Sequence, residues 1–171
     1  MDTLKYTLLQ WDERLRGLFG WLGGFAPGLL LRLILAFEFM EAGVEKLRGE
    51  NWFGDIQAQF LFPFNVLPPE LSWFVATWAE IIGGALLIAG LGTRYAAAML
   101  MVLTVVAAHA VHFPPAGTPF AEFWQGYAIS NDGHGNFKLP LLFFIMLLAL
   151  LGQGGGKLSL DHWIAWRRGL V

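Results

Sequence analysis

The stretch ELSWFVATWAEIIGGALLIAGLGTRYAAAMLMVLTVVAAHAVHF, residues 70–113, decides the fold of this chain. It contains two apolar runs, 70–90 and 94–113. Each run is about as long as the ~20 residues that a helix needs to cross the ~30 Å hydrocarbon core of a bilayer. The residues between them, 91–93, are too few for anything but a tight turn. The stretch therefore predicts an antiparallel pair of membrane-spanning helices.

Two further apolar runs flank this pair, one near each end of the chain. Of the 171 residues, 56% are hydrophobic and 14% charged, against ~45–50% apolar and ~25% charged in soluble domains. A water-soluble fold of this size could not bury so much apolar surface, whereas lipid solvates it. We therefore expect an all-α membrane protein: a single domain over residues 1–171, with a four-transmembrane-helix bundle whose spans are about 28–47, 70–90, 94–113 and 137–153.

Both flanks of the bundle have the pattern of amphipathic helices. In residues 4–22, leucines and Trp11 recur every three or four positions, with most of the charged residues between them. This spacing is typical of a helix that lies on a membrane surface. In residues 159–168, Ser159 is a candidate N-cap, and tryptophans stand next to arginines. We therefore expect interfacial helices at the N- and C-termini.

The long connections, 48–69 and 114–136, are rich in aromatic residues and proline. They are expected to form structured caps at the membrane–water boundary, where tryptophan and tyrosine are favoured. The distribution of lysine and arginine then predicts the orientation, with both termini in the cytoplasm and the two caps facing outward. Eight basic residues lie on the cytoplasmic side (Lys5, Arg14, Arg16, Arg32, Arg94, Lys157, Arg167 and Arg168) against three on the other (Lys46, Arg48 and Lys138).

Composition excludes several functions. The chain has no cysteine, which removes disulfides, thiolate metal sites, iron–sulfur clusters and dithiol redox chemistry. A formal net charge of −2 argues against nucleic-acid binding.

The N-terminal residues do not have the pattern of a cleaved signal peptide. They carry Asp2, Asp12 and Glu13, and they lack a short apolar core followed by a small-residue cleavage site. We therefore expect the first apolar run to be retained as a span rather than cleaved as a signal peptide.

Charged residues inside spans are costly and therefore mark candidate sites. The first span carries Glu38, Glu41 and Glu45 on one stripe, which also points Lys46 and Arg48 at the outer boundary. Glu38 and Glu41 are either functional ligands or partners of the two cations. Glu45, near the surface, is expected to be solvated.

Glu80 lies deep in the second span, where no cation of its own span can reach it. It is either a functional carboxylate or a buried carboxyl bonded to a neighbouring helix. Gly83, four residues after Ala79 and next to Gly84, is expected to let another helix pack closely.

The third span ends with His109 and His112, which are one turn apart on a regular helix. Together with Glu41 and Glu80 they are a candidate metal set for zinc, iron, manganese or copper. The alternative is that both are interfacial histidines facing headgroups. His134, Asn136 and Lys138 are expected at the mouth of this cluster, which the orientation places in the outer half of the membrane.

Beyond these residues, three stretches carry a resemblance to a known family: RLILAFEFMEAGVEKL (32–47), AEIIGGALLIAGLGTRYAA (79–97) and GNFKLPLLFFIMLLALLGQGGGKLSLD (135–161), together with His112 at the end of the third span. The chain resembles the DoxX family of small bacterial four-span membrane proteins over about residues 29–161. The GLGTR turn and the late G-K-x-S-L-D are the most specific pieces.

The resemblance implies a multi-pass protein of the bacterial inner membrane. The nearest likeness is to members encoded beside machinery that matures copper-binding peptides, which often carry a glutamate where this chain has Lys138. Other relatives look like subunits of thiosulfate:quinone oxidoreductases, or like partners of secreted superoxide dismutase and sulfurtransferase. By resemblance, Glu41, Lys46, Glu80 and His112 form a shared polar site.

Three hypotheses follow for the function. The first is a redox-linked accessory subunit that binds a quinone-like ligand in an outer-half polar pocket, with Trp78 or Phe39 stacking on the ring. The second is a protein that handles copper or another transition metal without catalysis of its own, and the third is a structural scaffold subunit. Membrane lipid and other membrane or periplasmic proteins are the expected partners. Candidate cofactor-binding residues are Glu38, Glu41, Lys46, Trp78, Glu80, His112, Asn136 and Lys138.

Overall fold

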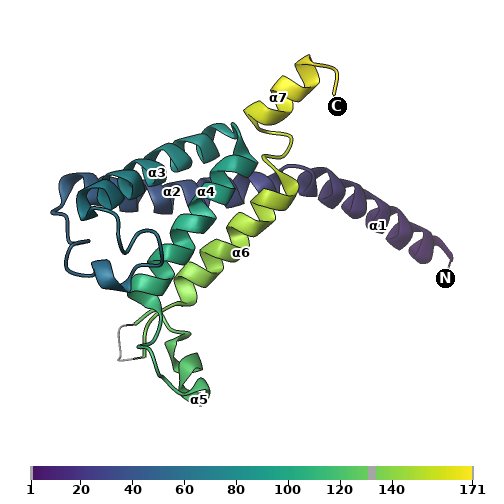
Figure 1. The fold of residues 1–171 in the computed structure, drawn as a ribbon. Helices are drawn as coiled ribbons and strands as arrows, with labels where there is room; N and C mark the ends of the chain where they lie inside the picture. The colour runs from purple at the N-terminus through teal and green to yellow at the C-terminus, as the bar shows by residue number, and fades with distance from the viewer. Residues whose placement is uncertain (1, 131–133, 171) are drawn as a thin grey trace.

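The computed structural model describes residues 2–130 and 134–170, and these contain helices and no strands (Figure 1). Four long helices form the bundle: α2 (Ala26–Arg48), α3 (Pro69–Ala89), α4 (Thr93–Ala107) and α6 (Lys138–Gln153). The other elements are α1 (Asp2–Gly23), α5 (Phe120–Phe123), α7 (Leu160–Arg167), a π-turn that extends α4 (Ala108–His112), and 3-10 turns at Gln57–Gln59 and Trp124–Gly126.

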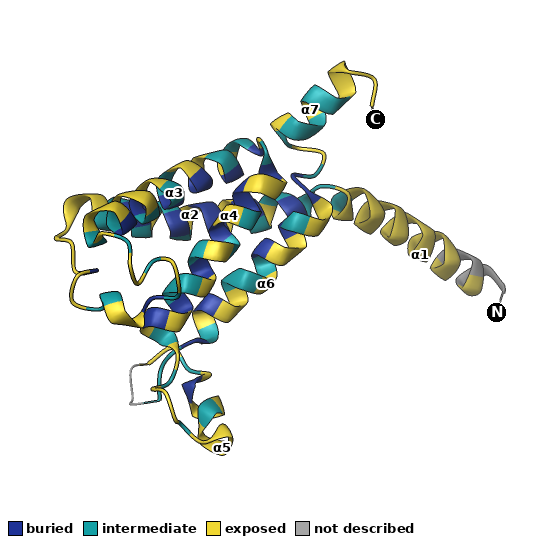
Figure 2. Cartoon of the chain, in the orientation of Figure 1, coloured by how far each residue is buried: buried dark blue, intermediate teal, exposed yellow. Residues whose placement is uncertain are grey.

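The bundle helices pack as two pairs, α2 against α3 and α4 against α6, and α3 and α4 join the pairs (Figure 1). The inward faces of the four helices are buried and their outward faces exposed (Figure 2). One continuous core of leucine and alanine side chains with one phenylalanine results: Leu35, Ala36, Phe39, Leu87, Ala96, Ala97, Leu100, Leu147 and Leu150.

Glycines at the helix contacts confirm the predicted close packing around Gly83. A Cβ atom at Gly83 would lie 2.9 Å from Leu100 Cδ2 of α4. A Cβ atom at Gly43 of α2 would lie 2.7 Å from Ile81 Cγ1 and 3.0 Å from Glu80 Cβ of α3. No larger residue fits at these two positions without a shift, so glycine sets the short distance between α2, α3 and α4.

The tight turn predicted between the second and third spans is confirmed. Gly90 and Gly92 take the left-handed backbone conformation, with φ of 64° and 57°. Glycine adopts this conformation without the steric cost that a side chain would add. The chain can therefore reverse direction within three residues.

Three helical segments are long and apolar enough to cross a membrane. They are Leu8–Arg48, which contains most of α1 and all of α2, then Pro69–Ala89 and Thr93–His112. The fourth bundle helix, α6, is apolar but has only 16 residues, which corresponds to roughly 24 Å at 1.5 Å per residue. Exposed leucine, isoleucine, valine and phenylalanine side chains cover the outside of the bundle, as a lipid environment requires. The molecule is a membrane protein, and a fourth crossing by α6 stays a prediction.

The terminal helices lie at one end of the bundle. α1 projects away from it with its described side chains largely exposed (Figures 1 and 2), among them Trp11, Leu15 and Leu18. The side chain of Leu4 lies outside the described set. Ser159 is the N-cap of α7, as predicted, because its hydroxyl accepts a hydrogen bond from the His162 N–H at 3.1 Å. Placement of both helices on a membrane surface stays a prediction.

The connection between α2 and α3, residues 49–68, folds back beside the end of α4, and we refer to it as the lid. Its Phe53 and Phe60 are buried together with Ala110, and Phe64 and Trp73 pack against them. The second connection carries α5 at the same end of the bundle (Figure 1). Part of the polar run at 130–136 falls on residues 131–133, which lie outside the described residues.

Candidate functional site

A cavity of about 520 Å³ lies between α2, α3 and α4, beneath the lid. Four polar side chains face it, and the rest of its wall is aliphatic or aromatic. The lining residues are Lys46, Trp52, Phe53, Phe60, Phe64, Ser72, Val75, Ala76, Ala79, Glu80, Met99, Val102, Leu103, Val106, Ala107, Val111 and His112.

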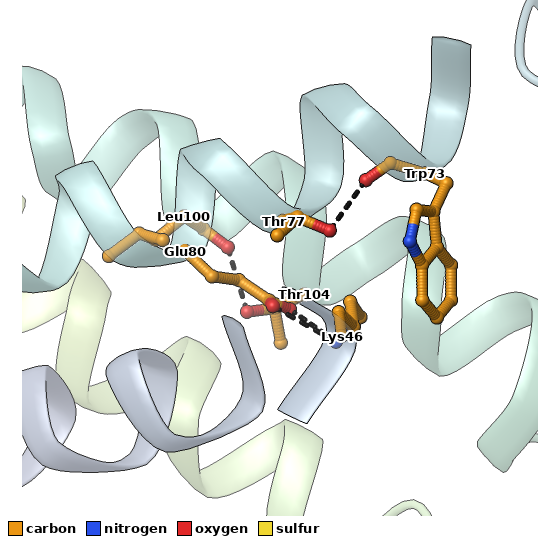
Figure 3. Close-up of polar contacts among 6 residues, drawn as sticks. All are labelled: Lys46, Trp73, Thr77, Glu80, Leu100 and Thr104. Atoms are coloured by element: carbon orange, nitrogen blue, oxygen red, sulfur yellow. Dashed lines mark hydrogen bonds and ion pairs between the residues drawn. The ribbon is translucent and has the colours of Figure 1, made fainter. Parts of the chain in front are cut away.

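The central feature of the cavity is an ion pair between two helices. Lys46 Nζ of α2 lies 2.9 Å from both carboxylate oxygens of Glu80 on α3 (Figure 3). The Glu80 residue is 4% exposed. Gly43 makes the pair possible, because it lies directly against Glu80 and one helical turn before Lys46.

The pairing gives Glu80 a partner on a neighbouring helix, and its place on the cavity wall keeps the functional interpretation as well. The Glu80 carboxylate is bonded to Lys46 of the neighbouring helix α2. From the sequence, Lys46 was one of two cations expected to pair with Glu38 and Glu41. Glu41 is exposed and Glu38 half-buried, and neither lines the cavity. The reason is geometric: the close approach of α2 and α3 brings Lys46 nearer to a carboxylate on the other helix than to those on its own.

The hydroxyl groups of Thr77 and Thr104 near the pair bond to backbone carbonyls, whereas that of Ser72, on the cavity wall, has no partner among the described residues. Thr77 Oγ1 donates to the Trp73 carbonyl and Thr104 Oγ1 to the Leu100 carbonyl, each at 2.8 Å (Figure 3). Ser72 is 7% exposed, and its hydroxyl has no hydrogen-bond partner within the described ranges. A buried polar group without a partner is unfavourable. The Ser72 hydroxyl is therefore a vacant hydrogen-bonding group on the cavity wall.

His112 contributes the fourth polar side chain. Its Nδ1 atom lies 2.6 Å from Oδ1 of Asn136, just before α6. Since that oxygen accepts, Nδ1 donates, and in the neutral imidazole Nε2 is then an acceptor. Asn136 thus positions the imidazole, although it does not line the cavity itself.

The π-turn separates the two histidines that the sequence placed on one face. His109 is exposed, and its Nδ1 lies 3.0 Å from the Gln59 carbonyl of the lid. A π-turn is wider than an α-helical turn, so side chains three residues apart no longer project together. His109 does not line the cavity.

The candidate metal ligands are not gathered at one point. In residues 2–130 and 134–170, no three side chains of histidine, aspartate or glutamate lie close enough to hold an ion. Of the four candidates, Glu80 and His112 share the cavity, whereas Glu41 and His109 lie outside it. A metal site formed by these four residues stays a prediction. The described arrangement does not bring the four side chains together.

The aromatic wall comes from residues that the sequence analysis did not select. Trp78 is 39% exposed and packs against Phe74 outside the cavity. Phe39 is buried in the core, with its ring centroid 5.9 Å from that of Phe143. The lid supplies the rings instead, from Trp52, Phe53, Phe60 and Phe64. The aromatic composition of 48–69 is the signal in the sequence for this wall, but by itself it indicates only a cap at the membrane boundary.

Lys138 lies apart from the cavity lining as well. Its ammonium group lies over the Tyr127 ring, 5.1 Å from the centroid. This cation–π contact belongs to the second connection rather than to the cavity. The polar site is therefore smaller than predicted and consists of Lys46, Ser72, Glu80 and His112.

Comparison with known proteins identifies the family. The DoxX family model matches residues 28–113, which span α2, the lid, α3, α4 and the π-turn. A protein from Haemophilus influenzae with the name "Uncharacterized protein" is 44% identical over 133 residues, which are 78% of this chain and 80% of that protein. No solved structure matches the chain. The cavity-forming helices are thus the part that the family model recognises, and the chain belongs to the DoxX family.

Proposed function

We propose that this membrane protein is a redox-linked accessory subunit that binds a quinone-like ligand from the bilayer in the cavity beneath the lid. The observation that carries the proposal is an apolar cavity of about 520 Å³ whose polar groups include both donors and acceptors. Ligand sites of this size, with mostly apolar walls and a few placed polar groups, suit small aromatic molecules.

The polar groups match both redox forms of such a ligand. A quinone presents two carbonyl oxygens, which accept hydrogen bonds from the Lys46 ammonium and the unpartnered Ser72 hydroxyl. A quinol presents two hydroxyl groups, which can donate to the Glu80 carboxylate and to His112 Nε2. All four side chains line the same cavity. Electrons would come from or go to a partner oxidoreductase, since this proposal assigns only binding to the chain.

The route into the cavity favours a ligand dissolved in lipid. Val75 of α3 and Met99 and Val102 of α4 line the cavity and are also exposed on the outside of the bundle. These residues form an apolar rim between two helices that face the hydrocarbon core. With the orientation inferred from lysine and arginine, in a bacterial inner membrane with both termini in the cytoplasm, the cavity lies in the outer half of the bilayer.

The test measures quinone in the purified protein and its binding to defined variants. Lipid extraction should yield co-purified quinone, and a short-chain quinone titrated into the protein in detergent should bind. Ser72→Ala and Glu80→Gln should each weaken binding about tenfold, the loss expected for one hydrogen bond to a charged or buried group. Glu41→Gln is the matched control, since it removes a carboxylate from the same bundle outside the cavity. Absence of quinone and of binding, or an equal loss in the control, would overturn the proposal.

A metal-handling role is the second candidate, because Glu80 and His112 line one cavity. This is also the role suggested by the branch associated with copper-binding peptides. A metal ion would have to displace Lys46 from the Glu80 oxygens, so its binding should free the ammonium group. Elemental analysis of the purified protein tests this role. Absence of stoichiometric metal, with the same result in His112→Ala, would exclude the metal-handling role.

A scaffold role instead requires that Glu80→Gln disrupts assembly with partners rather than ligand binding.

A further inference from the structure

The two most specific motif pieces, 90–94 and 156–161, meet at the end of the bundle opposite the lid. Asp161 accepts hydrogen bonds from the backbone N–H groups of Gly92, at 2.7 Å, and Thr93, at 2.8 Å. The Asp161 N–H donates in turn to the Gly90 carbonyl at 2.9 Å. The buried Arg32 of α2 donates to the carbonyls of Leu87 and Leu158. These contacts tie α2, the α3–α4 turn and the start of α7 together.

A second cavity, of about 480 Å³, lies beside these contacts and has a different character from the first. Its wall is rich in glycine, carries a larger share of polar groups than the first cavity, and contains no phenylalanine or tryptophan. It is bounded by the α1–α2 corner, the α3–α4 turn, the loop after α6 and the start of α7. The lining residues are Gly24, Gly92, Thr93, Arg94, Tyr95, Gln153, Gly154, Gly155, Gly156, Lys157, Ser159, Asp161, His162 and Ala165.

Two cations of this cavity have no acidic partner. Arg94 and Lys157 line it, and neither forms an ion pair in the described part of the chain. Glycine backbone lies beside both charged groups. A Cβ atom at Gly24 would lie 3.2 Å from Lys157 Nζ, and one at Gly154 would lie 3.4 Å from Arg94 Nε. A side chain at either glycine would crowd the cation.

The loop between α6 and α7 lines the same cavity and carries backbone N–H groups without a partner among the described residues. Gly154 and Gly156 have φ of 76° and 73°. The N–H groups of Gly155, Gly156 and Lys157 donate no hydrogen bond to any described residue. The hydroxyl of Thr93, which is 0% exposed and lies against Gly155, is also without a hydrogen-bond partner among the described residues. Unused donors and two cations around one cavity favour an anionic ligand.

The acidic group of the cavity does not neutralise these cations. Both carboxylate oxygens of Asp161 are engaged by the backbone at the start of α4. Arg32 also interacts electrostatically with Asp161. His162, which also lines the cavity, carries no negative charge in either protonation state.

We propose that this second cavity binds a phosphate group, held by Arg94, Lys157 and the backbone N–H groups of residues 155–157, which have no hydrogen-bond partner among the described residues. A phosphate has several strong acceptor oxygens and a negative charge, which charge-assisted hydrogen bonds from arginine, lysine and backbone N–H groups bind well. The group comes either from the headgroup of an acidic phospholipid or from a free phosphate. The neighbouring α7 carries Arg167 over the exposed Trp163 and Trp166 rings, an arrangement typical of the membrane interface where headgroups lie.

The experiment uses the full chain purified in detergent, with two ligand arms. Native mass spectrometry compares binding of phosphatidylglycerol with that of phosphatidylcholine. Calorimetry measures inorganic phosphate against chloride at equal ionic strength. The double variant Arg94→Gln with Lys157→Gln should weaken binding by about tenfold or more, since each change removes a charge-assisted hydrogen bond. Lys157→Arg keeps the charge and should retain binding.

Arg167→Gln is the matched control, because it removes a cation from the same end of the molecule but outside the cavity. A preference for phosphatidylglycerol that the double variant loses and the control keeps identifies the lipid headgroup. Binding of inorganic phosphate with the same dependence on the variants, and no lipid preference, identifies a free phosphate. Binding of neither ligand, or an equal loss in Arg167→Gln, overturns the proposal. Both tested residues are exposed, so thermal unfolding should show an unchanged fold.

Discussion

The two ends of the bundle handle buried charge in different ways. At the lid end, Lys46 and Glu80 neutralise each other through side chains inside an apolar cavity. At the opposite end, Arg32 and Asp161 each bond to backbone groups of neighbouring segments. A side-chain pair can exchange its partner for a ligand without breaking the fold, whereas backbone groups left without a partner destabilise it. The lid end is therefore suited to binding, and the contacts of Arg32 and Asp161 to holding the helices together.

The largest expected effect is at the backbone-bonded end. Arg32→Ala removes the donor to the Leu158 carbonyl and one of the two donors to the Leu87 carbonyl, which keeps the Gly90 N–H. It also leaves a void where a side chain that is 1% exposed had been. We expect a loss of about 3 kcal/mol or more in the free energy of unfolding, measured by denaturation in detergent and followed by circular dichroism. Arg167→Ala, an exposed arginine, should change stability little. An Arg32→Ala protein as stable as this control would contradict the structural role.

The ion pair at the lid end should show non-additive effects. Lys46→Met leaves the buried Glu80 carboxylate without its cation and should lower the free energy of unfolding by about 3 kcal/mol. Glu80→Leu leaves only the half-buried Lys46 ammonium and should lower it by less. The double variant should recover most of that stability, because well-packed apolar residues replace a buried ion pair at little or no cost. It should nevertheless fail to bind the quinone. If the double variant recovers both stability and quinone binding, then Lys46 and Glu80 do not take part in ligand binding.

Gly43 tests whether close helix packing creates the pair. Gly43→Ala places a Cβ atom 2.7 Å from Ile81 Cγ1, which should push α2 from α3 and cost about 1–3 kcal/mol. The control is Gly17→Ala in α1, where nothing lies within 4 Å and the change should stabilise the helix by roughly 0.5–1 kcal/mol. Ligand affinity should fall in the first variant only. Equal behaviour of the two variants would show that α2–α3 spacing does not matter.

The smallest effects on stability and binding are expected at Glu41 and Trp78, the candidate site residues that do not line the cavity. Glu41→Gln and Trp78→Leu should each change stability by no more than about 0.5 kcal/mol and leave quinone affinity unaltered. Trp52→Leu, on the cavity wall, should weaken binding. Titration of all three variants with the same quinone ranks them by their affinity for it. A larger effect at Trp78 than at Trp52 would place the ligand on the outer face of α3 instead.

Local sequence patterns were sufficient for the helices and several of their ends. Apolar length predicted the positions of the bundle helices to within a few residues, and the run Leu91–Gly92–Thr93 predicted the turn. Ser159 was recognised as an N-cap because capping depends on residues close in sequence. The depth of Glu80 in an apolar run correctly predicted a group in need of a partner, since burial follows from the surrounding residues.

The partner of each polar group could not be read from the same patterns. Regular helical geometry placed His109 and His112 together, but a π-turn, which depends on the surrounding packing, points them apart. The rings Trp52, Phe53, Phe60 and Phe64 look like an ordinary boundary segment until the lid folds against α4. Pairing of Lys46 with Glu80 rather than Glu41 required knowledge of which helix lies next to α2.

The sequence by itself determined that lipid surrounds this protein and that its apolar segments are helices, because burial in hydrocarbon depends on composition and length alone. Only the tertiary structure decided which charges meet. Residues 34 positions apart, such as Lys46 and Glu80, come together through the glycine contacts between helices, and such contacts depend on how whole surfaces pack rather than on any local pattern.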